Sequence, residues 1–360
     1  MTFYDDLTRL ALAHQPISES DCHRILKDPE LNLLLLLQAA YQVRYAQWEN
    51  KVHIHVINNA QNGNCPEDCK YCAQAKSSDS DIQDYPLKSD EEILEEARQA
   101  YESGAFRYCM VFAGRGPRPK RVEKLASLIQ EIKAKYPIEV CVSAGLLDEQ
   151  GARQLKEAGL DRLNHNLNTS QSYYNRICST HDYQDRMNTL KAGKSVGLSL
   201  CSGVIVGMGE TDADIIQVAQ DLRQLEVPSI PVNFYMPIEG TPLGSAFGLS
   251  PQYCLRVLCL FRFLNPKSEL RVSAGREFHL RSLEVMSLYP ANSLFLDGYL
   301  NAKGSQAKTT LQMIKDAGFT ICSDFSVDDV LGKTTLSPEL KSLKDLKKVS
   351  AESFSVVPKT

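Results

Sequence analysis

The chain has 360 residues, 43% of them hydrophobic and 23% charged, with a formal net charge of -4 at pH 7. It is long enough to bury a core in one large domain or two. The weakly acidic balance argues against electrostatic binding of nucleic acid. Residues 1–13 lack the basic start and apolar core of a signal peptide, and the leucines at 33–37 are too few to span a bilayer. We therefore expect a cytoplasmic protein with no nucleic-acid or membrane partner.

Residues 1–50 predict helices only. The segment Ser18-Glu-Ser-Asp21 is a typical helix start, and residues 31–43 carry an apolar face wide enough to pack against a larger unit. The leucine run at 33–37 predicts a buried helix. We expect residues 1–50 to form an N-terminal helical extension.

From about residue 52, β-type runs alternate with amphipathic helical patterns, several of which end at a glycine, as helices favour. The candidate strands are 52–57, 107–113, 139–144, 162–168, 199–206, 230–236, 270–274 and 293–296. Strict alternation with helices indicates parallel βαβ units, and eight strands is the number that closes a barrel. We predict the α/β class, with a TIM-type (β/α)8 barrel over residues 51–322. An open doubly wound sheet is the alternative.

Residues 323–360 have a different composition, rich in Ser, Lys and Asp, and no strand pattern. We expect a polar C-terminal tail, partly helical or disordered. Its lysine-rich stretch at 341–348 is typical of a solvated face.

Eleven cysteines are too few for a disulfide scaffold, and their odd number and clustering favour metal binding and free thiols in a reducing compartment. Cys65, Cys69 and Cys72 follow the first strand at C-x3-C-x2-C spacing. Structural zinc and ordinary iron–sulfur sites use four protein ligands, whereas this loop supplies three. Three thiolates on a 4Fe–4S cubane leave one iron open, and the spacing resembles that of radical S-adenosylmethionine (radical SAM) enzymes. A non-catalytic zinc module is an alternative that leaves the missing ligand unexplained.

Four later strands each carry one chemically useful residue within an apolar run: Cys109, Cys141, Cys201 and Arg271. A single buried cysteine is usually a small hydrophobe. A buried arginine, however, requires a partner, because an uncompensated buried charge costs several kcal/mol. Three thiols and an arginine on four strands therefore suggest a second metal site inside the barrel.

Other polar signals are weaker. Asn164 and Asn166 share one face of a strand, Asn233 interrupts another, and residues 203–210 form a glycine-rich join between a strand and a helix. His53 and His55 also share a face, where a core or rim role is favoured over metal binding. Five cysteines have no partner at ligand spacing: Cys22, Cys178, Cys254, Cys259 and Cys322.

Together these residues resemble the biotin synthase family, from about residue 52 to residue 319. The matching stretches are 65–72, 107–110, 164–167, 201–203, 207–211, 231–233, 240–243 and 273–277. The resemblance implies a sulfurtransferase that inserts sulfur into dethiobiotin to form biotin. The alternative is a related radical SAM enzyme that acts on a small molecule without inserting sulfur; it does not require the second site.

The resemblance also implies roles for individual residues. Cys65, Cys69 and Cys72 would hold a 4Fe–4S cluster that binds S-adenosylmethionine, and the second site would hold a 2Fe–2S cluster as sulfur donor, with Arg271 as an unusual ligand. The implied contacts to S-adenosylmethionine are Tyr71, Asn166, Asn168, Arg186, Gly207 and Glu210. The implied contacts to dethiobiotin are Asn164, Asn166 and Asn233.

Two departures from the family pattern stand out. Asn168 replaces an aspartate that some members place on the ribose, and Asn301-Ala302 replaces a pair of threonines that commonly meet the substrate's carboxylate tail. The family further implies reduced flavodoxin or ferredoxin as electron donor and a homodimer.

Overall fold

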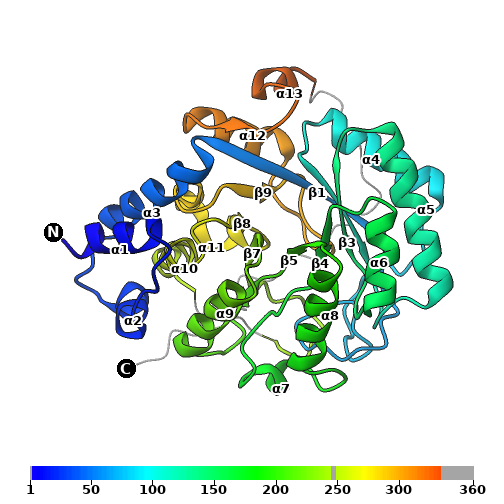
Figure 1. Cartoon of the computed structure of the whole chain (residues 1–360), viewed down its shortest axis with the longest axis horizontal. Helices are drawn as coiled ribbons and strands as arrows, with labels where there is room; N and C mark the ends of the chain where they lie inside the picture. The colour runs from blue at the N-terminus through cyan, green and yellow to red at the C-terminus, as the bar shows by residue number, and fades with distance from the viewer. Residues whose placement is uncertain (1, 245–248, 334–360) are drawn as a thin grey trace.

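The structure is a computed structural model that describes residues 2–244 and 249–333. Most of the predicted polar tail, residues 334–360, lies outside the described residues. Within the described part, nine parallel strands surround a central axis, and helices cover their outer side (Figure 1). The strands are β1 (Lys51–Gln61), β2 (Arg107–Phe112), β3 (Glu139–Ser143), β4 (Arg162–Asn164), β5 (Ser199–Cys201), β6 (Val204–Val206), β7 (Ser229–Phe234), β8 (Glu269–Val272) and β9 (Ser293–Phe295).

The sheet closes on itself because β1 pairs with β2 on one side and with β9 on the other, where His53 lies opposite Ser293. β5 and β6 share one position in the barrel, since both pair with β7. The predicted (β/α)8 barrel is therefore confirmed, and the open doubly wound sheet is excluded. A further short strand, β10 (Thr320–Ile321), pairs with the beginning of β1.

The run at 199–206, expected as one strand, is broken between β5 and β6. Gly203 lies so close to β7 that a Cβ on it would be 1.8 Å from the carbonyl oxygen of Pro231. The preceding N–H, that of Ser202, donates to the carbonyl of Ser229 at 3.0 Å. The break thus keeps the backbone bonded to β7 while it changes direction.

Helices follow the strands along the outer side of the barrel. The main outer helices are α4 (Asp90–Glu102), α5 (Pro119–Lys135), α6 (Glu149–Glu157), α8 (Tyr183–Ser195), α9 (Asp212–Gln224) and α10 (Pro251–Leu264). Shorter ones are α7 (Tyr174–Ile177), α11 (Arg276–Leu280), the 3-10 helix η1 (Arg281–Leu288), α12 (Ala307–Asp316) and α13 (Val327–Lys333). Capping boxes open α4, α8 and α9, and satisfy their first backbone N–H groups. Gly104, Gly159 and Gly197 follow α4, α6 and α8 with positive φ.

Three helices precede the barrel: α1 (Phe3–Leu12), α2 (Glu19–Lys27), which Ser18 caps, and α3 (Leu33–Trp48). They pack on the outer helices, α3 against α10 and α2 against α9 and α10 (Figure 1). The expectation that the leucine run is buried is wrong for part of it: Leu36 and Leu37 are buried, but Leu34 is 65% exposed and Leu35 44%. The reason is that α3 has the barrel on one side only.

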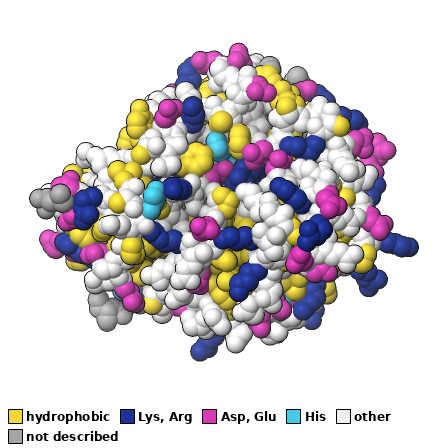
Figure 2. Space-filling model, in the orientation of Figure 1, with side chains coloured by type: hydrophobic (Ala, Val, Ile, Leu, Met, Phe, Trp, Pro, Cys, Tyr) yellow, Lys and Arg dark blue, Asp and Glu magenta, His cyan; other side chains and the backbone are white. Residues whose placement is uncertain are grey.

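None of the described helices is both long and apolar enough to cross a bilayer. On the face shown in Figure 2, acidic and basic side chains are interspersed, and hydrophobic side chains form small groups among them. The division into residues 1–50, 51–322 and 323–360 stays a prediction.

Gly203→Ala tests the break between β5 and β6. We expect the free energy of unfolding to fall by about 3 kcal/mol or more, the upper end for overpacked sites, because the new Cβ meets backbone that cannot give way. In the control Gly197→Ala the Cβ meets nothing within 4 Å, at a φ of +76°. Its cost is the left-handed backbone alone, about 1–2 kcal/mol. Equal losses in chemical denaturation would contradict this account.

Candidate active site

A cavity of about 290 Å3 opens at the carboxyl ends of the barrel strands. This is the end at which (β/α)8 enzymes carry their active sites. Of the residues singled out from the sequence, its walls include Tyr71, Cys72, Cys109, Cys141, Asn164, Asn166, Asn233 and Arg271. The departing pair Asn301 and Ala302 also lines it. One cavity therefore joins the cysteine loop above the barrel to the thiols inside it.

The loop that carries the three spaced cysteines runs from β1 to α4 and folds back on itself. The N–H of Cys65 donates to the carbonyl of Gln74 at 3.2 Å, and the N–H of Cys72 donates to that of Cys69 at 3.0 Å. Backbone N–H groups of Glu67 and Gly114 hydrogen-bond to the Cys65 sulfur. Burial raises the pKa of Cys72 to about 11, so in the absence of a metal this thiol keeps its proton.

The sulfur atoms of Cys65, Cys69 and Cys72 are not gathered as the ligands of one ion would be. Within the described residues, the only three Cys, His or carboxylate ligand atoms that all lie within 4.8 Å of one another belong to Cys69, Cys178 and His181. Cys65, Cys69 and Cys72 do not form such a set. The loop therefore supplies three thiols that do not surround a single-ion position.

The polar residues expected to meet S-adenosylmethionine lie beside this loop. Asn168, at a φ of +69°, donates its side-chain N–H to the Tyr71 hydroxyl. Buried Arg186 donates from Nη1 to the carbonyl of Asn166 at 2.6 Å, and from Nε to the hydroxyl of Tyr174. Tyr71 and Asn166 thus face the cavity, while Asn168 and Arg186 support them from behind.

The turn after β6 contains the remaining two of these residues. The carboxylate of Glu210 accepts the backbone N–H of Gly207 at 2.6 Å and that of Met208 at 2.8 Å. Burial raises the pKa of Glu210 despite these bonds. Gly207 has a φ of +100°, which favours glycine. Glu210 therefore holds the shape of its own loop, and neither residue is among those lining the cavity.

The asparagines of the barrel differ in how free they are. Asn233 uses both ends of its amide on neighbouring strands: Nδ2 donates to the carbonyl of Val204 at 3.1 Å, and Oδ1 accepts from the N–H of Ala274 at 3.2 Å. Asn164 donates to the sulfur of Cys201 at 3.2 Å. Asn233 thus keeps one amide N–H and one oxygen lone pair for a ligand, and the Asn164 carbonyl oxygen also remains for one.

The second group of thiols converges inside the barrel. Cys109 and Cys141 are direct neighbours across β2 and β3, and Cys201 hydrogen-bonds with Cys141. The guanidinium Nη1 of Arg271 lies 3.7 Å from the sulfur of Cys201. All four side chains are at most 6% exposed. The hydrogen bond from Cys141, aided by Arg271, lowers the pKa of Cys201 well below its usual value. Thiolate character is what an iron–sulfur cluster requires of its ligands.

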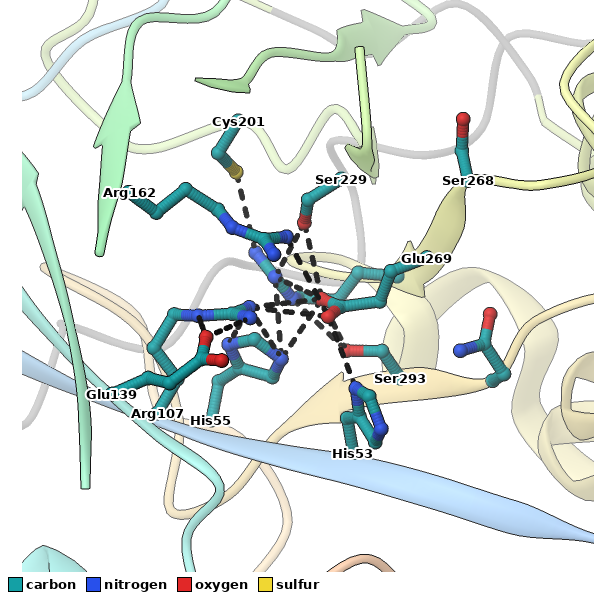
Figure 3. Close-up of polar contacts among 12 residues, drawn as sticks. His53, His55, Arg107, Glu139, Arg162, Cys201, Ser229, Ser268, Glu269 and Ser293 are labelled. Atoms are coloured by element: carbon teal, nitrogen blue, oxygen red, sulfur yellow. Dashed lines mark hydrogen bonds and ion pairs between the residues drawn. The ribbon is translucent and has the colours of Figure 1, made fainter. Parts of the chain in front are cut away.

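Below these thiols, one carboxylate gathers the cationic side chains of the barrel interior (Figure 3). Glu269, on β8, is 2% exposed. Its oxygens accept from Arg271 Nη2 at 2.6 Å and Arg107 Nη1 at 3.1 Å, and lie 3.1 Å from His53 and 3.0 Å from His55. Burial by itself raises the Glu269 pKa, but Arg107 and His55 outweigh it and hold the pKa well below the usual range. His53 and His55 have the core role expected for them.

The network fixes how Arg271 points. Nε donates to the Ser293 hydroxyl at 3.2 Å, and Nη2 donates to both Glu269 and the Ser229 hydroxyl. Only Nη1 remains to face the thiols. Arg107, which also contacts Glu269, is paired with Glu139 at 2.6 Å as well, and Arg162 Nη1 lies 3.7 Å from Glu269.

Sequence reasoning missed two parts of the site. Glu269 stands two residues before Arg271, so the period of two in a strand places both on one face; that pattern was a usable signal. Cys178, predicted to have no partner, lies 3.7 Å from Cys69 and 3.3 Å from Nδ1 of His181. The Cys-x2-His spacing of Cys178 and His181 could be seen in the sequence. Their contact with Cys69 could not be predicted from it.

Known proteins resemble the chain along its whole described barrel. Residues 62–222 match the Radical SAM superfamily, and residues 231–320 match the Biotin and Thiamin Synthesis associated domain. The chain is 55% identical over 315 residues to the biotin synthase of Magnetococcus marinus, which covers 88% of this chain and 98% of that protein. The chain belongs to the biotin synthase family.

A second biotin synthase, from Acaryochloris marina, is 52% identical over 324 residues, covering 90% of this chain and 94% of that protein. Membership of the biotin synthase family makes the chain an enzyme and excludes the non-catalytic zinc module. The family predicted from the sequence motifs is thereby confirmed.

Solved structures extend the fold comparison beyond the biotin synthase family. Methylornithine synthase superimposes with a TM-score of 0.75 at 19% identity, covering 92% of this chain and 100% of that one. The FeFe-hydrogenase maturase of Carboxydothermus hydrogenoformans gives 0.74 at 16% identity, covering 91% and 81%. At this identity the likeness concerns the fold alone.

Glu269→Gln tests the carboxylate network. We expect the free energy of unfolding at pH 7 to fall by about 3–5 kcal/mol, because buried Arg271 loses its carboxylate partner and Arg107 keeps only the partly exposed Glu139. In the wild-type chain the carboxylate stabilises the fold above pH 4.5, the ordinary glutamate pKa. That contribution disappears as the pH falls through the lower pKa of the folded state, because the unfolded chain takes up the proton first. The variant's stability should therefore depend less on pH in this acid range.

Glu139→Gln is the matched control, since Glu139 pairs with the same Arg107 but its side chain is 35% exposed. Its loss should be within about 1 kcal/mol. Denaturant titrations at pH 7 and at several acid pH values measure both variants. A loss in Glu269→Gln no larger than in Glu139→Gln would refute the central role of Glu269.

Proposed function

We propose that this chain is a sulfurtransferase that inserts sulfur into dethiobiotin to form biotin, with S-adenosylmethionine as the radical source. The observation that carries the proposal is the shared cavity: Cys72 of the upper loop and Cys109, Cys141 and Arg271 of the barrel interior line the same space. A substrate held there has a radical-generating site on one side and a sulfur-donating site on the other.

We assign the 4Fe–4S cluster to Cys65, Cys69 and Cys72. When bound, this cluster supplies one electron for the reductive cleavage of S-adenosylmethionine to methionine and the 5′-deoxyadenosyl radical. The chain contributes a loop with three thiols and no fourth ligand, which leaves a coordination position for the substrate. The N–H groups of Glu67 and Gly114 stabilise negative charge on the Cys65 sulfur.

We assign the 2Fe–2S cluster to Cys109, Cys141, Cys201 and Arg271. When bound, this cluster is the source of the inserted sulfur. Glu269 acts as a positioning residue: it holds Arg271 Nη2, so that Nη1 is directed at the thiols. The same carboxylate offsets the positive charge of Arg107.

The remaining assigned residues bind and orient the two small molecules. We place S-adenosylmethionine against Tyr71 and Asn166, with Asn168, Arg186, Gly207 and Glu210 shaping that wall, and dethiobiotin against Asn164, Asn166 and Asn233. Asn301 and Ala302 at the cavity wall take the place of the threonine pair. Apolar side chains, among them Ile57, Met110 and Phe295, complete the cavity. Such a lining excludes water and other hydrogen donors that would quench a carbon radical.

The electron donor, oligomeric state and compartment are proposed from the family resemblance. We propose reduced flavodoxin or ferredoxin as donor, a homodimer, and a cytoplasmic location. The abundance of free thiols suits a reducing compartment, because all eleven cysteines occur without a disulfide.

Two alanine variants separate the two sites. Cys72→Ala should abolish the cleavage of S-adenosylmethionine, because the upper loop then has two thiols for the cluster. Cys201→Ala should retain measurable cleavage and lose biotin formation, because the radical forms without a sulfur donor. Release of 5′-deoxyadenosine and of biotin, measured in the same assay, gives both readouts.

Cys254→Ala is the control: Cys254 is buried in α10 on the outer side of the barrel and should leave both products unchanged. Equal loss of cleavage in Cys72→Ala and Cys201→Ala would contradict the division into a radical site and a sulfur site.

A further inference from the structure

A second set of metal-type ligands lies directly behind the upper cysteine loop. Cys178, at the end of α7, places its sulfur 3.7 Å from that of Cys69 and 3.3 Å from Nδ1 of His181. The three ligand atoms lie within 4.8 Å of one another, and all three residues are buried. The role proposed for Cys69 as a cluster ligand leaves Cys178 and His181 without a function.

The distances match a single tetrahedral ion. Zinc–sulfur bonds of about 2.3 Å at tetrahedral angles separate two sulfur ligands by about 3.8 Å, and a zinc–nitrogen bond of about 2.0 Å brings a nitrogen ligand to about 3.5 Å from each sulfur. The observed separation of Cys69 and Cys178 is 3.7 Å, and that of Cys178 and His181 is 3.3 Å. The third pair, Cys69 and His181, has its ligand atoms within 4.8 Å of each other.

Two carboxylates lie beside this set, each next to one of its members, and either must turn toward the ion to become a fourth ligand. Oδ1 of Asp68 lies 3.2 Å from the Cys178 sulfur, and Oε2 of Glu67 lies 2.5 Å from Nδ1 of His181. Both belong to the same loop as Cys69, and Glu67 is itself buried. A set of two thiolates, one imidazole and one carboxylate is suited to zinc or ferrous iron.

We propose that Cys69, Cys178 and His181 bind one thiophilic divalent ion, Zn²⁺ or Fe²⁺, with Asp68 or Glu67 as the fourth ligand. The ion binds when the upper loop holds no cluster. Only metal–ligand bonds form. The two thiol protons leave to solvent, the imidazole stays neutral with its proton on Nε2 instead of Nδ1, and no electron is transferred.

The ion and the 4Fe–4S cluster exclude one another, because both need the sulfur of Cys69. This consequence rests on the proposed function, whereas the ion site itself does not. A ferrous ion held here is positioned beside the loop where the cluster assembles. A zinc ion held here blocks that assembly.

Binding also displaces one contact. Nη2 of Arg186 donates to Nε2 of His181 at 2.9 Å, so the ring proton lies on Nδ1 and is donated to Glu67. An ion on Nδ1 moves the ring proton to Nε2, where it faces the Arg186 donor, and the Arg186 contact must open. Arg186 is assigned to the wall that binds S-adenosylmethionine, so the ion-bound state is also unprepared for that substrate.

The experiment uses the full chain, stripped of iron without oxygen and titrated with Co²⁺, whose visible absorption reports the number of thiolate ligands. We expect one ion per chain with two thiolates. Cys178→Ser should weaken its affinity by more than about 100-fold, since the loss of supporting partners alone costs 10–100-fold. Cys72→Ser and Cys201→Ser should remain within a few-fold of the wild type, which places the ion outside both cluster sites.

A second measurement shows that the Cys178→Ser chain is folded and tests the competition. Reconstitution with iron and sulfide should give the 4Fe–4S absorption in the Cys178→Ser chain. One equivalent of Zn²⁺ added beforehand should slow this step in the wild type and not in the variant. If Cys178→Ser binds Co²⁺ as tightly as the wild type, the site does not exist. Failure of the Cys72→Ala prediction would instead count against the proposed function, and would leave the Co²⁺ result standing.

Discussion

The interior of this barrel depends on the buried carboxylate of Glu269. Without it, Arg271 would lose its carboxylate partner and Arg107 would keep only the partly exposed Glu139, and an uncompensated buried charge costs several kcal/mol. With it, their charges are compensated and their geometry is fixed, since its oxygens accept from both. The carboxylate therefore makes it possible for an arginine to stand among three cysteines inside a hydrophobic core. The proposed 2Fe–2S site requires that the charge of Arg271 be compensated in this way.

Barrel closure sets the relation between the two thiol groups. The cysteines of β2, β3 and β5 lie within strands, while the upper loop follows the end of β1. Parallel strands all end at one side, so that loop covers the mouth of the space whose lower part the strand cysteines line. Two sites with different ligands thus face one cavity. The same closure presses β6 against β7, which is why only glycine fits at position 203.

The sequence was a good guide to the barrel and to the family, for identifiable reasons. Period-two strands and amphipathic helices are local signals, so the alternation of strands and helices could be predicted. The C-x3-C-x2-C spacing has few chemical meanings, and the cysteine and arginine within apolar strands stood out against their neighbours. The leucines of α3 could not be assigned correctly from the sequence, because an apolar run does not indicate which of its faces meets the barrel. Leu34, expected to be buried, is exposed.

What the sequence determined by itself is the set of chemical groups, their order, and the family to which the chain belongs. The tertiary structure alone decided which distant groups meet. Cys69 and Cys178 are 109 residues apart and touch because α7 packs beneath the upper loop, where the N–H of Lys70 donates to the carbonyl of Ile177. Likewise, Arg107 and Glu269 are 162 residues apart and pair across the barrel interior. Such contacts arise from closure of the whole sheet, so no local pattern in the sequence could show them.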